Sequence, residues 1–407
     1  MKKIGIEKMN IYGGSLSLSQ KDLAIARDKD PEVVLRDYLI DTRSLIPPYE
    51  DTVTMCVNAA LSILTEEDKK QIGMLIAGTE GSVDFGKPIS TNVHSALGLN
   101  PNVRNYETKH ACYSGVAALD TAINWIASGL NKGRKALVVA ADFSRKHFLK
   151  DHEFVLGGVA AAVLVSENPK IIEYELDKKG TWTTDVYDTF RPSAKAEMGN
   201  NEVSLFSYTD AIEGAFLHYK DNVGDVNFDE YFKYNIYHTP FPGMSFQAHR
   251  VLCNLQRKRK KAEIKESFNE KVMPTLRYAQ RIGSCYGASN FVCLSGLLKS
   301  VPDITGERIG MFSYGSGCIG EFYSGIILPD AKKMIEDLSI DSELDKRKQL
   351  SVKEYEALEN LRESYIENPD FETDLSILDN WYDKYYKGSG KLILKKVDNY
   401  FRTYERV

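Results

Sequence analysis

The sequence is poor in the features that mark membrane or secreted proteins. Among its 407 residues, no apolar run reaches the roughly 18 residues that a membrane-spanning helix needs. The N-terminal stretch Met1–Glu7 contains basic residues but no apolar core behind them, so we expect no signal peptide. These absences lead us to expect a cytoplasmic protein.

Cysteine and histidine are also scarce, and neither is spaced as a metal ligand. The seven histidines form no HxxH or HExxH pattern, and the six cysteines form no CxxC pair. The cysteines are Cys56, Cys112, Cys253, Cys285, Cys293 and Cys318. Several lie in apolar segments, where we expect reduced core thiols. A net charge of −5 argues against a general nucleic-acid binder. We therefore expect neither a metal nor bound nucleic acid.

What is present predicts an α/β fold. Short apolar runs typical of buried strands alternate with helical patterns in the first half of the chain. The strand-like runs are Met74–Gly78, Lys135–Asp142 and Ala160–Ser166, and the helical patterns are Asp51–Leu64 and Gly115–Gly129. The second half repeats this style less regularly, with strands expected at Tyr234–His238, Arg308–Gly317 and Ser324–Pro329 and a helix at Phe246–Gln256. Residues after about 330 are charged, aromatic and mostly helical in pattern.

The most informative residue is Cys112, which lies between a polar stretch and the apolar helical pattern Val116–Ile126. This order places the thiol at or near a helix N-terminus, where free N–H groups and the helix dipole favour a thiolate. A thiolate attacks thioesters readily and forms an acyl-enzyme. A lone cysteine is more often an inert core thiol, so this interpretation depends on partner residues.

Two further residues complete a candidate site. Glu80 follows an apolar strand and precedes Gly81 and Ser82, a suitable place for a general base whose pKa rises on burial. His238 ends a strand before Thr239-Pro240, so that its imidazole can hydrogen-bond a substrate carbonyl. The Cys112 amide and the turn Tyr314–Gly317 could donate N–H groups to a developing oxyanion.

Taken together, these residues resemble the 3-hydroxy-3-methylglutaryl-CoA (HMG-CoA) synthases of the thiolase superfamily. The resemblance extends from Gly5–Glu7 to Glu321–Gly325. The matching stretches are Gly78–Ser82, Ala111–Tyr113, Val186–Asp188 with Arg191-Pro192, His238 with Pro240-Phe241, Arg281–Gly283 with Tyr286, and Phe312–Gly317. It implies a layered αβαβα fold of two related halves, residues 1–167 with Glu80 and Cys112 and residues 168–407 with His238. A helical extension would begin at about residue 330.

The resemblance also implies catalytic roles. Cys112 would carry the acetyl group, Glu80 would act as acid and base on its methyl group, and His238 would hold the β-keto thioester of the acceptor. Substrate-binding residues would be Arg191, Pro240, Phe241, Ser284, Tyr314, Gly315 and Ser316. The family usually has asparagine where this chain has Ser284, whose hydroxyl has a shorter reach.

A second departure indicates the subtype. Primary-metabolism synthases usually have a lysine for coenzyme A phosphates where this chain has Gly243, and further lysines where it has Ser245, Phe246 and Gln247. Cys112–Gly115 and Asp84–Lys87 resemble the polyketide β-branching branch of the family. Substrates of that branch are carried on phosphopantetheine of acyl carrier proteins and need no nucleotide contact. Carrier proteins are acidic, so the basic run Arg257, Lys258, Arg259, Lys260 and Lys261 is a plausible docking site.

We therefore predict a homodimeric acyltransferase that adds acetate from a donor carrier protein to the β-ketone of a polyketide on an acceptor carrier protein. No metal or organic cofactor is required. One alternative is the mevalonate-pathway HMG-CoA synthase, which uses acetyl-CoA and acetoacetyl-CoA. Another is a non-catalytic thiolase-like subunit, which would form no acyl-enzyme on Cys112.

Overall fold

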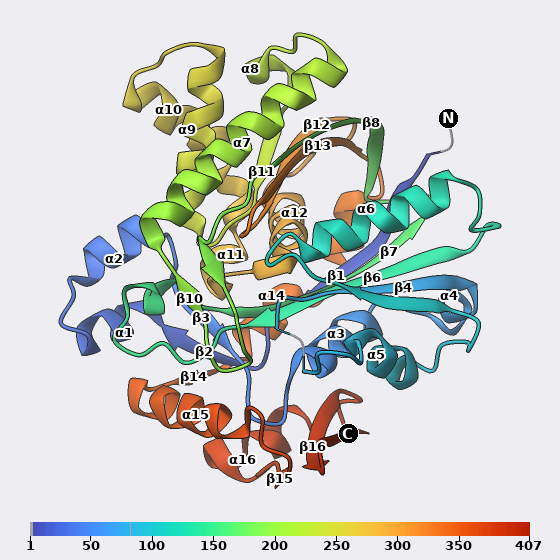
Figure 1. Ribbon diagram of the computed structural model, residues 1–407, viewed down its shortest axis with the longest axis vertical. Coiled ribbons are helices and arrows are strands. Elements are labelled where there is room, and N and C mark those ends of the chain that lie inside the picture. The colour runs from blue at the N-terminus through green and yellow to red at the C-terminus, as the bar shows by residue number, and fades with distance from the viewer. Residues whose placement is uncertain (1–2, 82) are drawn as a thin grey trace.

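The computed structural model describes residues 3–81 and 83–407, so Ser82 of the predicted glutamate motif lies outside the described residues. Within this part, a nine-stranded sheet has the order β11-β12-β13-β8-β1-β7-β6-β4-β5 (Figure 1). Its strands are β1 (Gly5–Tyr12), β4 (Ile72–Gly78), β5 (Arg104–Thr108), β6 (Lys135–Phe143), β7 (Gly158–Ser166), β8 (Ile172–Thr183), β11 (Tyr234–Tyr237), β12 (Arg308–Gly315) and β13 (Ile319–Ile327). The strands expected within the sheet are confirmed, with small shifts at their ends.

The sheet consists of two groups of strands, and the chain passes from one to the other between β7 and β8. In the first group, β4 runs parallel to β5 and β6, and β7 pairs antiparallel with β6 and β1. In the second, β11 runs parallel to β12, and β13 pairs antiparallel with both β12 and β8. The groups join where Gly5 and Ile6 of β1 pair with Glu173 and Ile172 of β8.

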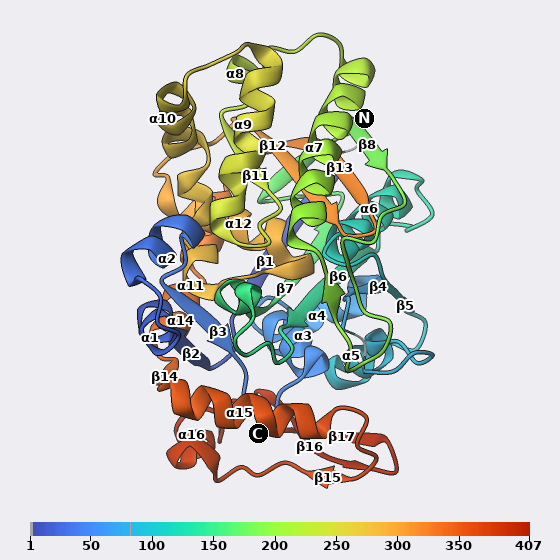
Figure 2. The same cartoon turned by 60° about the vertical axis from the view of Figure 1, so that its left-hand side comes forward.

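Helices cover both groups and separate them (Figures 1 and 2). The main helices are α3 (Thr52–Leu61), α5 (Ile89–Leu97), α6 (Ser114–Ala127), α7 (Asn201–Val223), α9 (Ser245–Gln256) and α12 (Ser289–Ser300). Helices α6 and α12 lie between the two groups, α3 and α5 lie outside the first, and α7 and α9 lie on the side of the second. This is the layered, thiolase-like α/β arrangement that was expected.

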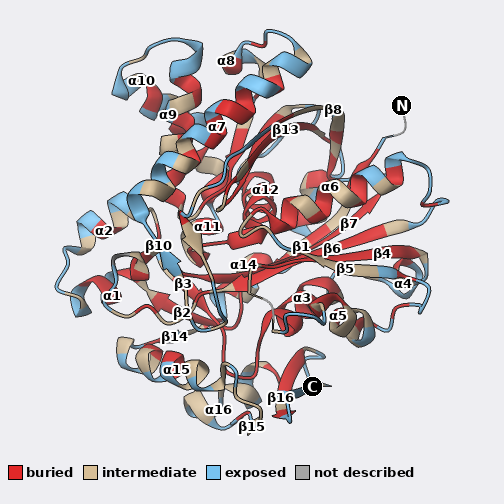
Figure 3. Cartoon of the chain, viewed as in Figure 1, coloured by how far each residue is buried: buried red, intermediate tan, exposed pale blue. Residues whose placement is uncertain are grey.

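Burial on both faces explains why the strands are so apolar. Every residue of β4 and β7 is buried, and the central strands are mostly red in Figure 3. Strands covered on both faces need near-continuous apolar residues. Helix α6 approaches the short 3₁₀ helix Tyr286–Ala288, which precedes α12, because Gly115 lacks a side chain: a Cβ there would lie 2.1 Å from the Gly287 carbonyl oxygen.

Smaller elements surround this core. A three-stranded sheet has the order β14-β2-β3, and β9 and β10 form a short hairpin. The elements are β2 (Leu16–Ser19), β3 (Thr42–Leu45), β9 (Thr189–Phe190), β10 (Met198–Gly199), β14 (Lys348–Leu350), α1 (Gln20–Ala26), α2 (Pro31–Tyr38), α4 (Glu66–Gln71), α8 (Phe228–Tyr231), α10 (Lys261–Lys271), α11 (Ala279–Ile282), α13 (Ala331–Glu336) and α14 (Ile340–Asp345). Short 3₁₀ helices occur at Asp151–Val155, Pro242–Met244, Met273–Leu276 and Tyr286–Ala288.

Residues 351–407 form a C-terminal segment at the bottom of Figure 1. It contains α15 (Val352–Tyr365), β15 (Phe371–Glu372), α16 (Ile377–Tyr385), β16 (Leu392–Asp398) and β17 (Phe401–Arg406). The sequence favoured mostly helices in this region, but β15, β16 and β17 form an antiparallel sheet. Leu392, Ile393, Leu394 and Val397 are buried, which accounts for the strand β16.

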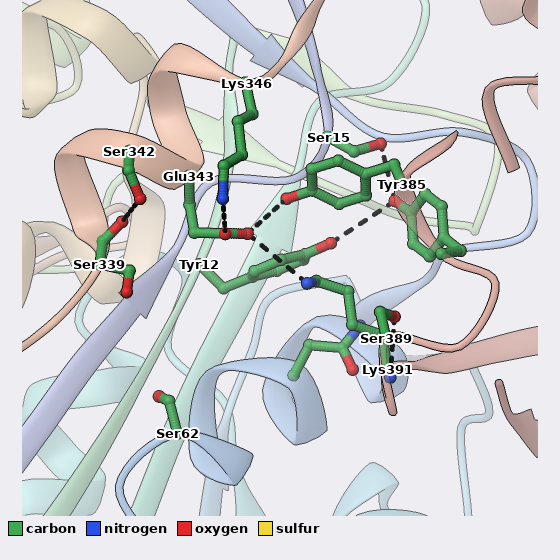
Figure 4. Close-up of polar contacts among 12 residues, drawn as sticks. Tyr12, Ser15, Ser62, Ser339, Ser342, Glu343, Lys346, Tyr385, Ser389 and Lys391 are labelled. Carbon is green, nitrogen blue, oxygen red and sulfur yellow. Dashed lines mark hydrogen bonds and ion pairs between the residues drawn. The ribbon is translucent and has the colours of Figure 1, made fainter. Parts of the chain in front are cut away.

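Buried polar contacts attach the C-terminal segment to the first group of strands. The Tyr12 hydroxyl of β1 lies 3.5 Å from the Tyr386 hydroxyl, which donates to Ser15 at 2.7 Å. Glu343 of α14 accepts from Tyr385 at 2.8 Å and lies 3.5 Å from the Lys391 ammonium (Figure 4). No helix within residues 3–81 and 83–407 is long and apolar enough to cross a membrane.

Candidate active site

Cys112 and Glu80 lie in direct contact at the carboxyl ends of the first group of strands. Glu80 follows β4, and Cys112 lies two residues before α6. The thiol Sγ is 3.4 Å from Glu80 Oε2. Ala111, immediately before the cysteine, has φ 43°, an unusual conformation for a residue with a side chain. The predicted nucleophile and base are thus brought together.

His238 reaches the same region from the second group, with β12 as the link. Its backbone N–H donates to the Phe312 carbonyl at 2.7 Å, and its ring lies 6.3 Å from the ring of Tyr314. The next residue, Gly315, abuts the cysteine loop: a Cβ there would lie 2.3 Å from the His110 carbonyl oxygen. This close approach requires glycine. It places the end of β12, which is hydrogen-bonded to His238, against the segment that carries Cys112.

An arginine between two carboxylates adjoins the thiol. Arg191 lies 3.0 Å from Glu80 and 3.0 Å from Glu197, and Glu197 lies 3.2 Å from the His147 imidazole. Burial raises the pKa of Glu80, while the positive charge of Arg191 opposes this rise. Arg191, expected to bind substrate, therefore contacts the carboxylate of Glu80 in this structure. Sequence reasoning missed Glu197 and His147, because no local motif links them to Glu80.

Asp142 is a further buried carboxylate that the sequence interpretation left unassigned. Its Oδ1 accepts hydrogen bonds from the Thr79 hydroxyl at 2.7 Å and from the N–H groups of Glu80 and Gly81 at 2.9 and 3.1 Å. Burial and the nearby Glu80 raise its pKa to about 7. Asp142 thus fixes the backbone that carries Glu80. The signal available was its place at the end of a predicted parallel strand, beside the strand that precedes Glu80.

The electrostatics of Cys112 differ from the sequence-based expectation. The helix N-terminus was expected to favour a thiolate, but α6 begins only at Ser114. Burial, followed by the charges of Glu80 and Asp142, raises the pKa of the thiol well above its ordinary value. That expectation was wrong, because two nearby carboxylates and desolvation outweigh the helix dipole. The resting cysteine is a neutral thiol next to a carboxylate that can accept its proton.

His238 is buried and neutral. Its side chain is 1% exposed, and burial lowers its pKa to about 3. Within the described residues, Nδ1 has no hydrogen-bond partner. The Tyr208 hydroxyl donates to the His238 carbonyl at 2.8 Å and fixes the backbone. A buried, unpaired imidazole nitrogen leaves one hydrogen bond for a bound ligand.

The glycine turn at the end of β12 is held by Asp188. This carboxylate accepts from the Tyr314 hydroxyl at 2.6 Å and from the Gly317 N–H at 2.9 Å. The Gly317 N–H is therefore engaged and does not serve as the free donor that the turn was expected to supply. The backbone of Ser316 contacts the His110 side chain, which places Ser316 beside the cysteine loop.

Ser284, Pro240 and Phe241 lie farther along the second half. Ser284 is 7% exposed, and its N–H donates to Val155 at 2.9 Å. Phe241 packs edge-on against Tyr38 of α2, with ring centroids 5.4 Å apart. Pro240, beside it, is half-buried. Within residues 3–81 and 83–407, none of these three residues forms a hydrogen bond or ion pair with Cys112 or Glu80.

The packing around Gly243 explains why this chain has no lysine at that position. A Cβ at this position would lie 2.2 Å from the Asp37 carbonyl oxygen at the end of α2. Real Cβ atoms do not approach an oxygen so closely, so any side chain would displace α2. The backbone of α2 therefore occupies the space that a lysine side chain at position 243 would need.

The basic run after α9 is only partly free. Arg259 is largely buried and pairs with Asp229, and Arg257 lies 3.3 Å from Glu263. Lys258, Lys260 and Lys261 are exposed. A cavity of about 300 Å³ adjoins the run, lined by Phe246, Gln247, Arg250, Asn254, Arg259, Lys261 and Ile264. The three lysines and the exposed Arg257 are the part of this run that a partner can reach.

Comparison with known proteins identifies the family. Two family models match: "Hydroxymethylglutaryl-coenzyme A synthase N terminal" at residues 1–169 and "Hydroxymethylglutaryl-coenzyme A synthase C terminal" at residues 246–406. The chain is 41% identical over 373 residues to the polyketide biosynthesis 3-hydroxy-3-methylglutaryl-ACP synthase PksG of Bacillus subtilis (strain 168), covering 88% of each chain. It is 32% identical over 357 residues to the hydroxymethylglutaryl-CoA synthase of Enterococcus faecalis, covering 87% of this chain and 91% of that protein.

A solved structure supports the same conclusion. The curacin biosynthetic pathway HMG synthase in complex with acetyl donor-ACP has a TM-score of 0.95 and 38% identity, with full coverage of both chains. The identity to the two polyketide-pathway enzymes exceeds that to the hydroxymethylglutaryl-CoA synthase above. The chain belongs to the hydroxymethylglutaryl-CoA synthase family and is a condensing enzyme of that family, an acyltransferase that forms a carbon–carbon bond.

Proposed function

We propose that this protein is the HMG-CoA synthase-like enzyme of a polyketide β-branching pathway. It takes an acetyl group from a donor acyl carrier protein and adds it to the β-ketone of an intermediate on an acceptor carrier protein. The product carries a β-hydroxy and a β-carboxymethyl group. The chemistry rests on the 3.4 Å contact between Cys112 and Glu80, which joins a nucleophile to a base.

The first step is acyl transfer to Cys112. The neutral thiol gives its proton to Glu80 as sulfur attacks the donor thioester carbonyl. A carbon–sulfur bond to Cys112 forms, and the bond to the phosphopantetheine sulfur breaks. The leaving thiolate takes up the proton, so that Glu80 returns to its ionised form.

The second step forms the carbon–carbon bond. Glu80 removes a proton from the acetyl methyl group, and the resulting enolate attacks the β-carbon of the acceptor. The neutral imidazole of His238 holds the β-keto thioester of the acceptor by a hydrogen bond. The β-oxygen takes the proton back from Glu80 and becomes a hydroxyl. Water then cleaves the Cys112 thioester and frees the new carboxylate together with the thiol.

Gly243 favours a substrate bound to a carrier protein over one bound to coenzyme A. The packing of α2 against this position leaves no room for the phosphate-binding lysine of the coenzyme A enzymes. A carrier-bound thioester has no nucleotide end and needs no such cation. The exposed lysines Lys258, Lys260 and Lys261 offer an acidic carrier protein a positive surface.

We further propose a homodimer in which β5 pairs with its copy. Strand β5 is at the edge of the large sheet and is only partly buried. An edge strand with unpaired backbone groups is a natural place for strand pairing across a twofold axis. We also propose a cytoplasmic location, consistent with six free cysteines.

Intact-protein mass spectrometry tests the donor. Acetyl-carrier protein and acetyl-CoA are offered side by side, with Cys112→Ala as the control for the labelled site. We expect much faster acetylation from the carrier protein. Equal or faster labelling from acetyl-CoA would favour the mevalonate enzyme, and labelling that persists in Cys112→Ala would remove the proposed nucleophile.

Charge reversal tests the docking surface separately. Lys258→Glu combined with Lys260→Glu should slow acetylation from the carrier protein and leave acetylation from acetyl-pantetheine unchanged. The matched control is Lys353→Glu, an exposed lysine of α15. Equal rates for the double variant and the control would place carrier docking elsewhere.

A further inference from the structure

A row of charged groups leads from the nucleophile into the protein. Oε2 of Glu80 faces the Cys112 thiol at 3.4 Å, and its Oε1 lies 3.0 Å from Nη2 of Arg191. The same Nη2 lies 3.0 Å from Oε2 of Glu197, so one guanidinium nitrogen serves two carboxylates. His147 Nε2 donates to that Glu197 oxygen at 3.2 Å. The condensation described above gives Glu197 no role.

The β9–β10 hairpin places Arg191 and Glu197 opposite each other. Phe190 pairs with Met198 in its ladder, and Arg191 and Glu197 are the next residues along the two strands. Both side chains are largely buried, with 14% and 16% of their surface exposed. The hairpin therefore holds a second carboxylate against the arginine that contacts Glu80.

Glu197 and Arg191 form a charged pair. Burial opposes ionisation of Glu197, but the hydrogen bond from His147 and the charge of Arg191 outweigh burial and lower its pKa to about 2. Burial likewise opposes the charge of Arg191, but the carboxylates of Glu80 and Glu197 outweigh it and raise the pKa of the guanidinium. The two charges of the pair cancel, so little of the arginine's attraction is left for Glu80.

Glu80 therefore keeps a high proton affinity. Burial raises its pKa, the charge of Arg191 lowers it, and the charge of Glu197 raises it again. A carboxylate with a higher pKa is a stronger base, which favours removal of a proton from a methyl group. If Arg191 served Glu80 alone, the opposite charge would stabilise the ionised carboxylate and weaken the base.

Other charged groups also face the two carboxylates. Within the described residues, those around Glu80 are Cys112, Asp142, Arg145, Arg191, Glu197 and Tyr286. Those around Glu197 are Glu80, Arg145, His147, His152, Arg191 and Tyr286. Arg191 is the group that forms an ion pair with both carboxylates.

We propose that Glu197 is a positioning residue of the condensation: it takes up the charge of Arg191 and thereby keeps Glu80 a strong base. Glu197 acts through Arg191 rather than on the reacting atoms. In the base step, a C–H bond of the acetyl methyl group breaks, its proton moves to Glu80 and its electron pair enters the enolate. This inference rests on the proposed condensation, which assigns that step to Glu80.

Two opposite charge changes test the proposal. Cys112 is acetylated with acetyl-pantetheine, without acceptor or carrier protein, and exchange of the methyl protons with deuterated water is followed across a pH series. Glu197→Gln should move the acid limb of the exchange to lower pH. It should slow the plateau rate about tenfold, a part of the 100- to 10,000-fold that a positioned base contributes.

Arg191→Met should move the acid limb in the opposite direction, to higher pH. The double variant, which has the net charge of the unmodified enzyme, should lie between the two single variants. Glu213→Gln, which removes an exposed carboxylate of α7, is the matched control. A purely structural contact would slow exchange without moving the limb. An unmoved limb in either single variant, or movement of both in the same direction, would therefore overturn the proposal.

An infrared titration keeps the test independent of turnover. The carboxyl band of Glu80 is the difference between each protein and its Glu80→Gln counterpart, and its midpoint is followed with no thioester present. The midpoint should fall in Glu197→Gln and rise in Arg191→Met. Equal midpoints would refute the role of Glu197, even for a variant that exchanges too slowly to measure. Midpoints that move as expected, in a protein that carrier thioesters do not acetylate, would count against the proposed function alone.

Discussion

Sγ of Cys112 lies 3.4 Å from Oε2 of Glu80, so the carboxylate opposes ionisation of the thiol that it contacts. Burial and this charge together raise the pKa of Cys112, while Arg191 acts in the opposite direction. The site therefore holds Cys112 as a neutral thiol, beside a carboxylate that is placed to accept its proton during acyl transfer. This coupling makes several outcomes measurable.

Alkylation by iodoacetamide should report the coupling directly. Glu80→Gln removes a negative charge beside the thiol, so the pKa of Cys112 should fall and alkylation at pH 7 should accelerate. Arg191→Met removes the opposing positive charge and should slow it. Cys112→Ala defines the background rate from the other cysteines. A slower reaction in Glu80→Gln would show that the carboxylate does not oppose the thiolate.

Removing the Glu80 carboxylate should separate acetylation from condensation. In Glu80→Ala, a carrier thioester should still acetylate Cys112, since the nucleophile remains. Condensation should fall about 100- to 10,000-fold, the usual contribution of a positioned acid or base. Exchange of the acetyl methyl protons with deuterated water, followed by mass spectrometry, isolates the base step. Retention of that exchange in Glu80→Ala would assign proton removal to another group.

The neutral His238 predicts a particular pH profile. Burial lowers its pKa to about 3, so the imidazole stays uncharged between pH 5 and pH 8. We expect kcat/KM for the acceptor to show no acid limb near pH 6 from this residue. His238→Asn, which keeps a donor, should retain more activity than His238→Ala. An acid limb near pH 6 that disappears in His238→Asn would mean that the imidazole titrates there.

A second buried histidine should govern part of the acid stability. Burial lowers the pKa of His249 to about 3, and its nitrogens contact Tyr237 and Ser267 at 3.0 and 2.9 Å. Below about pH 6.5 the unfolded chain binds a proton that the folded protein does not, so the free energy of unfolding falls as pH decreases. Urea unfolding between pH 7 and pH 5 should show a slope smaller by about 1 kcal/mol per pH unit in His249→Gln. An unchanged slope would contradict this.

Replacing Gly243 by lysine should fail to create a coenzyme A site. The new side chain collides with the Asp37 carbonyl, so we expect a loss of about 1–3 kcal/mol in the free energy of unfolding, typical of overpacking. Acetylation by acetyl-CoA should not increase. Ala262→Lys, which adds the same charge at an exposed site, is the control. A faster reaction with acetyl-CoA in Gly243→Lys would show that packing does not explain the missing lysine.

How far the sequence predicts this molecule depends on how local each feature is. The strand Lys135–Asp142 and the residues Glu80, Cys112 and His238 were recognisable because apolar runs and short motifs are local patterns. Glu197 and His147 were not, because only the folding of the β9–β10 hairpin brings Glu197 to Arg191. The same limit explains why the expectation for the thiol pKa was wrong. Burial and the carboxylates of Glu80, which follows β4, and Asp142, on β6, raise the pKa of Cys112.

The C-terminal strands were missed for a different reason. Their aromatic and charged residues fit a helical pattern as well as a strand pattern. A usable signal was present in Asp398-Asn399-Tyr400-Phe401, where Asn399 and Tyr400 have φ 46° and 67° and connect β16 to β17 as a two-residue hairpin turn. Asparagine favours this left-handed conformation, so a turn could be expected there.

The buried attachment of the C-terminal segment sets a condition for building chimeric enzymes. Leu392 exchanges two hydrogen bonds with Asn58, and Trp381 donates to Ser15 at 3.1 Å. A segment transplanted from a relative without its matching upstream residues would leave buried polar groups unpaired, at about 1–3 kcal/mol each. The segments around Ser15 and Asn58, which lie 366 and 334 residues before their partners, must therefore be exchanged together with the C-terminal segment.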